Sequence, residues 1–495
     1  MSWFLGGIVA LIVGYFTYGR FVERVVGPDD RPTPAMRNPD GVDYVPMPRW
    51  KNMLIQLLNI AGTGPVIGVI LGIKFGKVAL LIIPVGCILM GAVCDFTAAM
   101  ISLRMNGANL PRIVRVNLGA RYAHIFAWAL MLLLMLCVAV FINVPAELID
   151  KEFFSGHSCF WWAVAVIFCY YVLATLFPVD KIIGRVYPFF GALLLLGSLA
   201  IFVALVVAAW RTPAILADCP AFASFKAANP IFPCIFITIA CGIISGFHST
   251  QSPIVARTLR SEREARATFY GMMIVEGVIA MIWAAASLAI YNIDSSALAR
   301  KGPAVLGLIA QHFLGSWIGG VTVLAVVILA ITSGDTALRS ARLSLAEELK
   351  ISQIPIWKRI ASTLPLIVVI GGMLWWSSRE AKSFNHLWNY FAWGNQFIAV
   401  TALLCSTVWL RRKGCGLKSL VTALPAFFMA TVVVSYILWT SARNGQPWGL
   451  VWTWSEGRLV NCGLPLVPAV SIGVVVAIAL VSLAWWLGGK KGGEE

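Results

Sequence analysis

The chain has 495 residues, of which 59% are hydrophobic and 12% charged, and its mean hydropathy is +0.84. A soluble domain carries about 25% charged residues, so this composition excludes an ordinary soluble protein. The net charge of +16 would suit a nucleic-acid partner, but the positions of the basic residues argue against one, as shown below.

Apolar runs of about twenty residues recur along the chain, and each is long enough to cross the ~30 Å hydrocarbon core of a bilayer. The first run, Trp3 to Tyr18, lacks a basic region before it and is followed by Arg20 and Arg24. It is therefore predicted to be a retained helix and not a signal peptide. We expect an all-α integral membrane protein with about 13 transmembrane helices, at approximately 2–19, 52–73, 78–102, 122–144, 160–177, 186–209, 231–256, 269–291, 317–338, 358–377, 384–410, 419–440 and 465–488.

A polar, proline-rich stretch, Gly27 to Trp50, separates the first two apolar runs and is predicted to be an ordered surface linker. If the N-terminus lies outside, most of the 38 Lys and Arg residues fall in loops on the cytoplasmic side. We therefore expect a multi-pass protein of the cell (inner) membrane with its C-terminus in the cytoplasm. The positive charge is then a topology signal, and no nucleic-acid partner is expected.

Two of the predicted spans contain residues that interrupt a helix. The second contains Gly62, Thr63, Gly64 and Pro65, and the seventh contains the polar run Ser245, Gly246, Phe247, His248, Ser249, Thr250 and Gln251. Breaking a helix inside the bilayer is costly unless the freed backbone lines a cavity. Each feature alone also fits a simple kink or a packing face of small residues. We take these eleven residues as candidate substrate-binding residues.

The two interruptions occur at matching places, because each opens a block of five helices, 52–210 and 231–410, and the second block enters from the opposite side. Residues 1–51 form an additional helix with the linker, and 419–495 contain two accessory helices. Paired interrupted helices are typical of a 5+5 inverted repeat of the leucine-transporter kind. Helix N-termini at the breaks would offer N–H groups to an anionic cargo, and the unwound carbonyls would suit a cation.

Three acidic residues fall inside predicted spans: Asp95, Glu276 and Asp335. An acid at the bilayer centre costs about 2.5–3.5 kcal/mol, so each should face protein or water. Such groups can carry a coupling proton or bind a coupling cation. Alternatively they make capping or interhelical hydrogen bonds, and Asp335 could pair with Arg339 one turn away.

Further polar residues extend the candidate site. His248 titrates in a range that suits a proton relay, although a buried histidine can also be a satisfied hydrogen-bonding residue. Asn395 and Gln396 in the eleventh span are candidates for substrate contact or for packing between helices. We expect a coupling-ion site formed by the carbonyl of Ala61 with Thr332, Ser333, Asp335 and Thr336.

Other classes of protein lack support in the sequence. No Walker A loop, HExxH motif or nucleophile elbow occurs, so neither an ATP-driven pump nor a membrane hydrolase is indicated. The eleven cysteines show no CxxC or metal-ligand spacing, and no metal or cofactor is expected. Cys159, Cys219 and Cys462 fall in predicted external loops, where one disulfide could form.

The sequence resembles the carbon starvation protein A family in several stretches. These are DGVDYVP (Asp40 to Pro46), IAGTGP, GAVCDF, the run from Phe236 to Ser249, MIVEGVIAMIWAAAS, TSGDTALRSAR and NYFAWGNQFIA. The resemblance covers about residues 40 to 410 and implies a broken-helix fold of the amino acid–polyamine–organocation superfamily. It also implies nutrient uptake in carbon starvation, with peptides or pyruvate as family substrates and proton symport as the driving mode.

The sequence departs from the family pattern beside the expected pocket. The family commonly has two histidines where this chain has Ile55 and Gln56, and the run from Ser249 to Pro253 also differs. The resemblance therefore does not fix the cargo. We expect a proton- or sodium-coupled importer of a small organic nutrient; a transporter-like sensor and a channel are the alternatives, and the oligomeric state cannot be read from the sequence.

Overall fold

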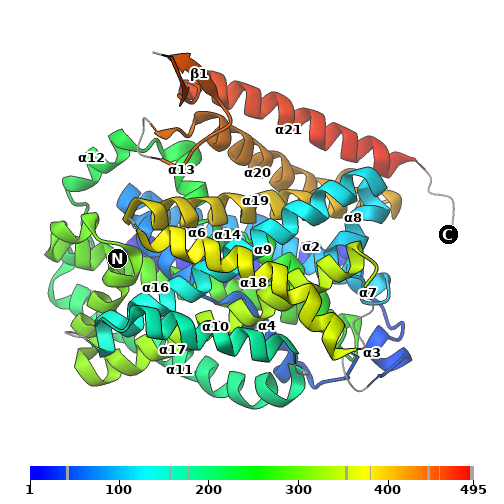
Figure 1. Cartoon of the computed structure of the whole chain (residues 1–495), viewed down its shortest axis with the longest axis horizontal. Helices are drawn as coiled ribbons and strands as arrows, with labels where there is room; N and C mark the ends of the chain where they lie inside the picture. Colours follow the sequence, from blue (N-terminus) through cyan, green and yellow to red (C-terminus); the bar gives the residue numbers. More distant parts are fainter. Residues whose placement is uncertain are drawn as a thin grey trace.

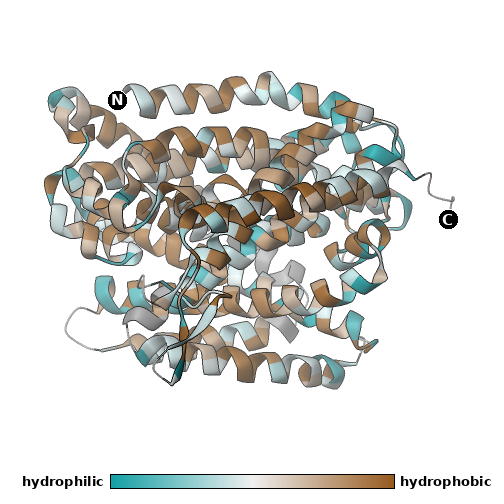
Figure 2. Cartoon of the chain, turned by 90° about the horizontal axis from the view of Figure 1, so that it is seen from above, coloured by the Kyte–Doolittle hydropathy of each residue, from teal (hydrophilic) through white to brown (hydrophobic). Residues whose placement is uncertain are grey.

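The computed structural model describes residues 1–40, 44–154, 158–176, 179–351, 355–379, 381–442, 446–455 and 457–490. Long helices run side by side, with α21 along one edge of the bundle (Figure 1). The helix that starts at the N-terminus runs along one edge in the view of Figure 2. Apolar residues cover most of each helix, and hydrophilic residues gather at the two ends of the bundle (Figure 2). This distribution is the one that a slab of hydrocarbon around the middle of the bundle requires.

Within the part that the structure describes, α-helices are labelled α and short 3₁₀ or π helices η. The elements before the seventh expected span are α1 (Ser2–Phe16), α2 (Tyr18–Val26), α3 (Pro34–Arg37), α4 (Arg49–Ile60), η1 (Gly64–Gly68), α5 (Val69–Gly72), η2 (Ile73–Phe75), α6 (Val78–Gly86), η3 (Cys87–Gly91), α7 (Ala92–Arg104), α8 (Leu110–Leu118), α9 (Ala120–Leu148), η4 (Ile149–Phe153), α10 (Phe160–Leu176), α11 (Val179–Arg211), η5 (Pro213–Leu216) and α12 (Ala221–Ala228). The remaining elements are α13 (Ile231–Thr238), α14 (Ala240–Ile243), α15 (Gly246–Ala256), η6 (Glu262–Glu264), η7 (Arg266–Tyr270), α16 (Gly271–Ile293), η8 (Ser295–Ala299), α17 (Gly302–Glu348), α18 (Ile356–Arg379), α19 (Ala381–Arg412), η9 (Gly416–Ser419), α20 (Leu420–Trp439), β1 (Trp452–Ser455), β2 (Arg458–Asn461) and α21 (Leu466–Gly489).

Among the described residues, ten helices are long and apolar enough to cross a membrane, and two bent helix pairs raise that number to as many as twelve. The chain is therefore a multi-pass membrane protein, as predicted. The expected span at 160–177 corresponds to a shorter apolar helix, Phe160–Ala174. Helix length alone thus does not establish the expected number of 13.

Both predicted helix interruptions are present. Helix α4 ends at Ile60, Ala61 leaves helical geometry (ψ 46°), and the chain bends by 54° before η1. Pro65 in η1 lacks the N–H that would continue the helical ladder. In the seventh span, Ile244 and Ser245 are extended between α14 and α15. This break is one residue earlier and shorter than the predicted polar run, because the residues from Gly246 to Ala256 are helical.

The ninth span differs from its prediction in length. Helix α17 runs over 47 residues with a single non-helical position at Gly315, whose φ of 70° only glycine adopts readily. The expected segment 317–338 is the part after this break. After this break the helix continues beyond the expected end, as far as Glu348.

The linker between α2 and α4 is ordered, as predicted, and we call residues 27–50 the strap. Positions 41–43 lie outside the described residues. The strap binds the loops that follow α7 and α15: Thr33 Oγ1 donates to the Leu259 carbonyl at 2.6 Å, and Met47 N–H to the Thr258 carbonyl at 2.9 Å. Tyr44 Oη donates to the Asn106 carbonyl at 3.0 Å. The strap therefore joins chain segments that are far apart in sequence.

An ion-pair network fixes the first part of the strap. The guanidinium of Arg104 donates to both carboxylate oxygens of Glu262 at 2.7 Å and contacts Asp29 at 3.3 Å. The Arg31 side chain hydrogen-bonds Asp29 and holds the pKa of this carboxyl below its ordinary value. A depressed carboxyl pKa contributes stability above the pKa of the unfolded chain and loses it as the pH falls through the folded value. The network is therefore intact at neutral pH and weakens only in acid.

We expect Arg104→Gln to destabilise the protein by about 3 kcal/mol, because it leaves the buried Glu262 carboxylate without its main partner. Glu262 is 2% exposed. The matched control is Arg263→Gln, which breaks the exposed pair of Arg263 with Asp30 and should change little. The midpoint temperature of unfolding in detergent measures both. Equal midpoints for the two variants would contradict a structural role for the buried pair.

Helices α20 and α21 pack against α19 on one side of the bundle (Figure 1). Small residues allow this contact: a Cβ on Gly473 would lie 2.3 Å from Ser435 Oγ, and one on Gly488 would lie 2.4 Å from Arg411 Cβ. Close approach at small residues is the usual means of helix packing in a membrane. The strands β1 and β2 form an antiparallel hairpin before α21. Cys159, Cys219 and Cys462 are free thiols, so the disulfide that could have formed among them is absent.

Candidate functional site

Three titratable side chains from three helices meet in the interior. His248 of α15 lies between Asp95 of α7 and Glu276 of α16, with His248 Nδ1 3.2 Å from Asp95 Oδ2 and His248 Nε2 3.7 Å from Glu276 Oε1. Asp95 and Glu276 are 0% exposed and His248 is 1% exposed. We call these residues the acid–histidine cluster. The structure thus brings together three residues that the sequence identified separately.

Several oxygen atoms of this cluster make no hydrogen bond within the described chain. Asp95 Oδ1 and both carboxyl oxygens of Glu276 are buried and make no hydrogen bond within the described chain. A buried charge without a partner is expensive. The cluster is therefore suited to bind and release protons, because a proton on a carboxyl removes the unpaired charge.

Close packing holds the helices of the cluster in place. A Cβ on Gly91 would lie 2.4 Å from the Ile243 carbonyl oxygen, so α7 approaches the break before α15 more closely than any larger residue would allow. Cys94 Sγ and Ser249 Oγ are 3.4 Å apart across the same contact. These contacts set the spacing between Asp95 and His248.

Helix α19 binds both ends of the second break. Gln396 Nε2 donates to the Ile244 carbonyl at 2.9 Å, and the Phe247 N–H donates to Asn395 Oδ1 at 2.8 Å. Asn395 Nδ2 also lies 3.3 Å from Cys241 Sγ. The two amides therefore bind backbone groups that the break leaves without helical partners, as capping side chains do at the ends of other helices. Gln396 Oε1 keeps no hydrogen-bond partner within the described chain.

The first break faces α17. A Cβ on Gly62 would lie 3.0 Å from Ser333 Oγ, which places the backbone after Ala61 beside the expected coupling-ion site. Thr63 Oγ1, Ser333 Oγ and Asp335 Oδ1 are buried without hydrogen-bond partners in the described chain. Oxygen atoms of this kind suit a small cation. Asp335 does not form the alternative ion pair with Arg339, which donates to the Ala174 carbonyl instead.

The other candidate hydroxyls are used within their own helices. Thr332 Oγ1 donates to the Leu329 carbonyl at 2.9 Å, and Thr336 Oγ1 donates to the Ser333 carbonyl at 2.9 Å. The two breaks also meet each other, because a Cβ on Gly64 would lie 2.4 Å from Cys241 Cβ.

The remaining candidate residues of α15 contact parts of the protein outside the acid–histidine cluster. Phe247 packs edge-on against Phe141 with ring centroids 6.1 Å apart. Thr250 Oγ1 accepts from Gln251 Nε2 at 3.1 Å, and Gln251 Oε1 has no partner in the described chain. Thr250 borders a cavity of about 60 Å³ that Arg257 and Arg339 also line. Ala61 and Pro65 are buried.

Gln56 is a polar residue that the sequence analysis did not include in the site. It lies in α4, is 0% exposed, and neither atom of its amide has a hydrogen-bond partner in the described chain. The signal for it was an amide side chain in an apolar run, one turn before the first break.

The described residues contain no group of three or more His, Cys, Asp or Glu side chains arranged to hold a metal ion.

Comparison with known protein families finds one that matches most of the chain. The family described as carbon starvation protein CstA matches residues 1–163, 148–305 and 304–436, and these segments include both breaks and the acid–histidine cluster. The chain belongs to the CstA family. This membership agrees with the family that its motifs resemble.

Relatives of this CstA-family chain are membrane transporters where their names give a role. An uncharacterized membrane protein of Haemophilus influenzae is 43% identical over 59% of this chain and 92% of its own length. The peptide transporter CstA of Helicobacter pylori is 24% identical over 85% of this chain and 79% of its own length. The pyruvate/proton symporter BtsT of Escherichia coli is 27% identical over 56% of this chain and 47% of its own length, so less than half of BtsT is matched.

The fold is also found among solved structures. The manganese transporter of Eremococcus coleocola has a TM-score of 0.54 at 15% identity, over 91% of this chain and 98% of its own. At this identity the likeness shows the fold alone. The CstA-family chain therefore shares its fold with a solved membrane transporter.

Proposed function

We propose that this CstA-family transporter imports a small organic nutrient, a peptide or a pyruvate-like carboxylate, by proton symport during carbon starvation. The observation that carries the proposal is the position of His248, in a broken helix and between two buried carboxyls at 3.2 and 3.7 Å. A histidine between two acids can accept a proton from one side and pass it to the other. The relatives named above support the two classes of cargo.

The cargo-binding region is proposed to lie between the two breaks. Gly64 lies close to Cys241 there, and α15 begins at Gly246, directly after the extended residues Ile244 and Ser245. N–H groups at a helix start favour an anion, which suits the carboxylate that a peptide and pyruvate share. Substrate contact by the residues from Gly62 to Pro65, from Ser245 to Gln251, and by Asn395 and Gln396 is part of this proposal.

The proposed architecture is a 5+5 inverted repeat, with halves at 52–210 and 231–410 and accessory segments at 1–51 and 419–495. Figure 1 supports an odd number of crossings, because α1 begins at one end of the bundle and α21 ends at the other. We place the N-terminus outside and the end of α21 in the cytoplasm, since the basic loops then lie inside.

A second cation site is the specific alternative for coupling. Ser333 Oγ and Asp335 Oδ1 lack partners beside the backbone of Gly62, so a sodium ion could bind there with the carbonyl of Ala61. Proton and sodium coupling differ in which gradient drives uptake. One experiment separates them.

The test is uptake of labelled pyruvate and of a labelled dipeptide into proteoliposomes, with either a proton gradient or a sodium gradient imposed. We expect uptake of one cargo to rise at least tenfold with an inward proton gradient and to be unchanged by sodium. Uptake driven by a sodium gradient alone would refute proton symport and support the alternative cation site at Ser333 and Asp335. Uptake that ignores both gradients would refute coupled transport, and cargo binding without flux would favour a sensor.

A further inference from the structure

A cavity of about 660 Å³ opens between the ends of α19, α20 and α21, far in sequence from the acid–histidine cluster. Its polar lining includes Arg411 and Lys490, and its aromatic lining includes Trp485 and Trp486. Neither Asp nor Glu is among its described lining residues. The cavity is therefore positively charged and lies at the level where these membrane helices end.

The two cations are held in place by aromatic rings. The Arg411 guanidinium carbon lies 4.3 Å from the ring centroid of Trp485, and Lys490 Nζ lies 3.6 Å from that of Trp486. Arg411 Nε is buried and makes no hydrogen bond within the described chain. Gly488 packs directly on Arg411 Cβ, which fixes the stem of the side chain.

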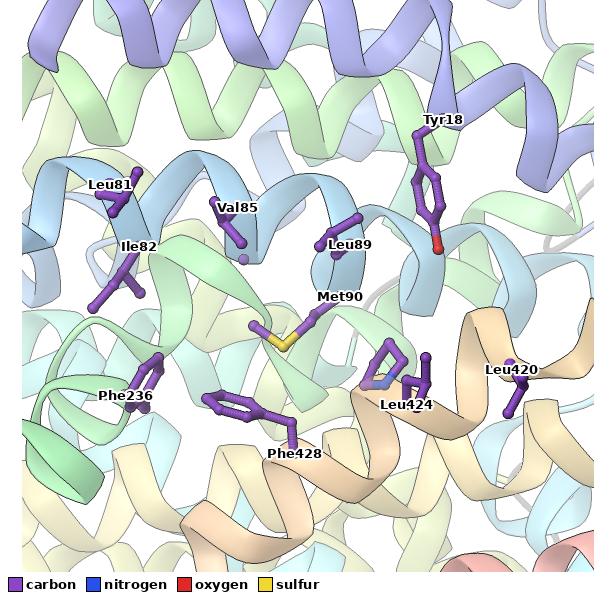
Figure 3. A pocket seen from close by; sticks show the side chains of 12 residues that line it. Tyr18, Leu81, Ile82, Val85, Leu89, Met90, Phe236, Leu420, Leu424 and Phe428 are labelled. Carbon is purple, nitrogen blue, oxygen red and sulfur yellow. The ribbon is translucent and has the colours of Figure 1, made fainter.

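A second cavity of about 470 Å³ neighbours the first and is lined almost entirely by apolar side chains. Leu420 borders both cavities. Figure 3 shows the side chains of Leu81, Val85 and Leu89 on one side of this space and those of Leu424 and Phe428 of α20 on the other. Leu420 and Phe428 are eight positions apart, or ~12 Å along a helix at 1.5 Å per residue, comparable to a large part of one acyl chain.

We propose that the two neighbouring cavities, which share Leu420, bind one anionic phospholipid, with its phosphate at Arg411 and Lys490 and an acyl chain along α20 in the apolar cavity. Basic pockets between helices at a membrane surface recognise lipid headgroups, and tryptophans favour the same level. The apolar cavity selects a lipid over a free phosphate, because a free anion gains nothing from it. The lipid would also fasten α21, which packs on α19 and α20.

The test uses the full chain, purified in neutral detergent and freed of lipid. Lipid occupancy by native mass spectrometry and the midpoint temperature of unfolding are measured with phosphatidylglycerol, with phosphatidylcholine of the same acyl chains, and with glycerol phosphate. We expect phosphatidylglycerol alone to bind and to raise the midpoint. The double variant R411Q/K490Q should bind it about tenfold less, since each basic group contributes to the attraction.

Two further variants keep the result interpretable. Lys358→Gln removes a cation that lies over Trp357 at 5.5 Å outside both cavities, and its phosphatidylglycerol occupancy should equal that of the parent chain. Leu424→Trp fills the apolar cavity without changing charge and should also lower occupancy. Equal binding of the two phospholipids, an equal loss in Lys358→Gln, or full stabilisation by glycerol phosphate would each overturn the proposal.

Discussion

His248→Gln should reduce proton-driven uptake by about 100-fold or more, the scale at which positioned proton-transfer groups contribute. Glutamine can keep a hydrogen bond to Asp95 but cannot carry a proton to Glu276. Uptake by the parent chain should rise as the external pH falls, and the variant should lose this dependence. The measurement is initial uptake into proteoliposomes across a series of imposed pH gradients.

Exchange of labelled for unlabelled cargo, without a gradient, distinguishes lost coupling from lost binding. We expect His248→Gln to retain exchange, because the backbone at the breaks is unchanged. His312→Gln is the control, since His312 is exposed and its ring lies against that of its neighbour Phe313. A variant at His248 that still concentrates cargo with a proton gradient would refute the relay and leave His248 as a hydrogen-bonding residue.

Gly246→Ala should destabilise the protein by about 3 kcal/mol, at the upper end of what overpacking a core costs. Its Cβ would lie 2.3 Å from the Asn395 carbonyl oxygen and 2.6 Å from the Ala399 N of α19. Both are backbone atoms, so the helix itself must shift. The shift also strains the hydrogen bond from Phe247 N–H to Asn395 Oδ1.

The matched control is Gly320→Ala in α17, where an added Cβ meets nothing within 4 Å. Alanine is a better helix former than glycine, so this variant should be at least as stable as the parent chain. Thermal unfolding in detergent compares the two. If Gly246→Ala unfolds at the parent temperature, the tight contact between α15 and α19 does not exist in solution.

The two helix breaks could be predicted from sequence because they depend on local chemistry. Glycine and proline weaken the helix wherever they occur, and polar side chains inside an apolar run mark the place. The family could be identified from the same stretches. The position of the second break was wrong by one residue, because Ile244 is apolar and gives no sign that it is extended.

The contacts that complete the site could not be read from one sequence. Asn395 and Gln396 reach the ends of a break about 150 residues earlier, and no local pattern shows which backbone groups an amide will meet. The same holds for His248, whose two carboxyl partners come from α7 and α16. Asp95, His248 and Glu276 were identified as buried titratable residues, but their meeting point depends on the packing of three helices.

The strap connects the three helices that carry the acid–histidine cluster. It is tied to the loop after α7, the loop after α15 and Glu262 at the turn before α16, and these three helices carry Asp95, His248 and Glu276. At 1.5 Å per residue, Arg104 is only ~14 Å along α7 from Asp95. The strap therefore connects the three helices of the acid–histidine cluster through hydrogen bonds at their ends. Under the proposed function, these helices would move as one unit during alternating access, and the distances between Asp95, His248 and Glu276 would stay constant.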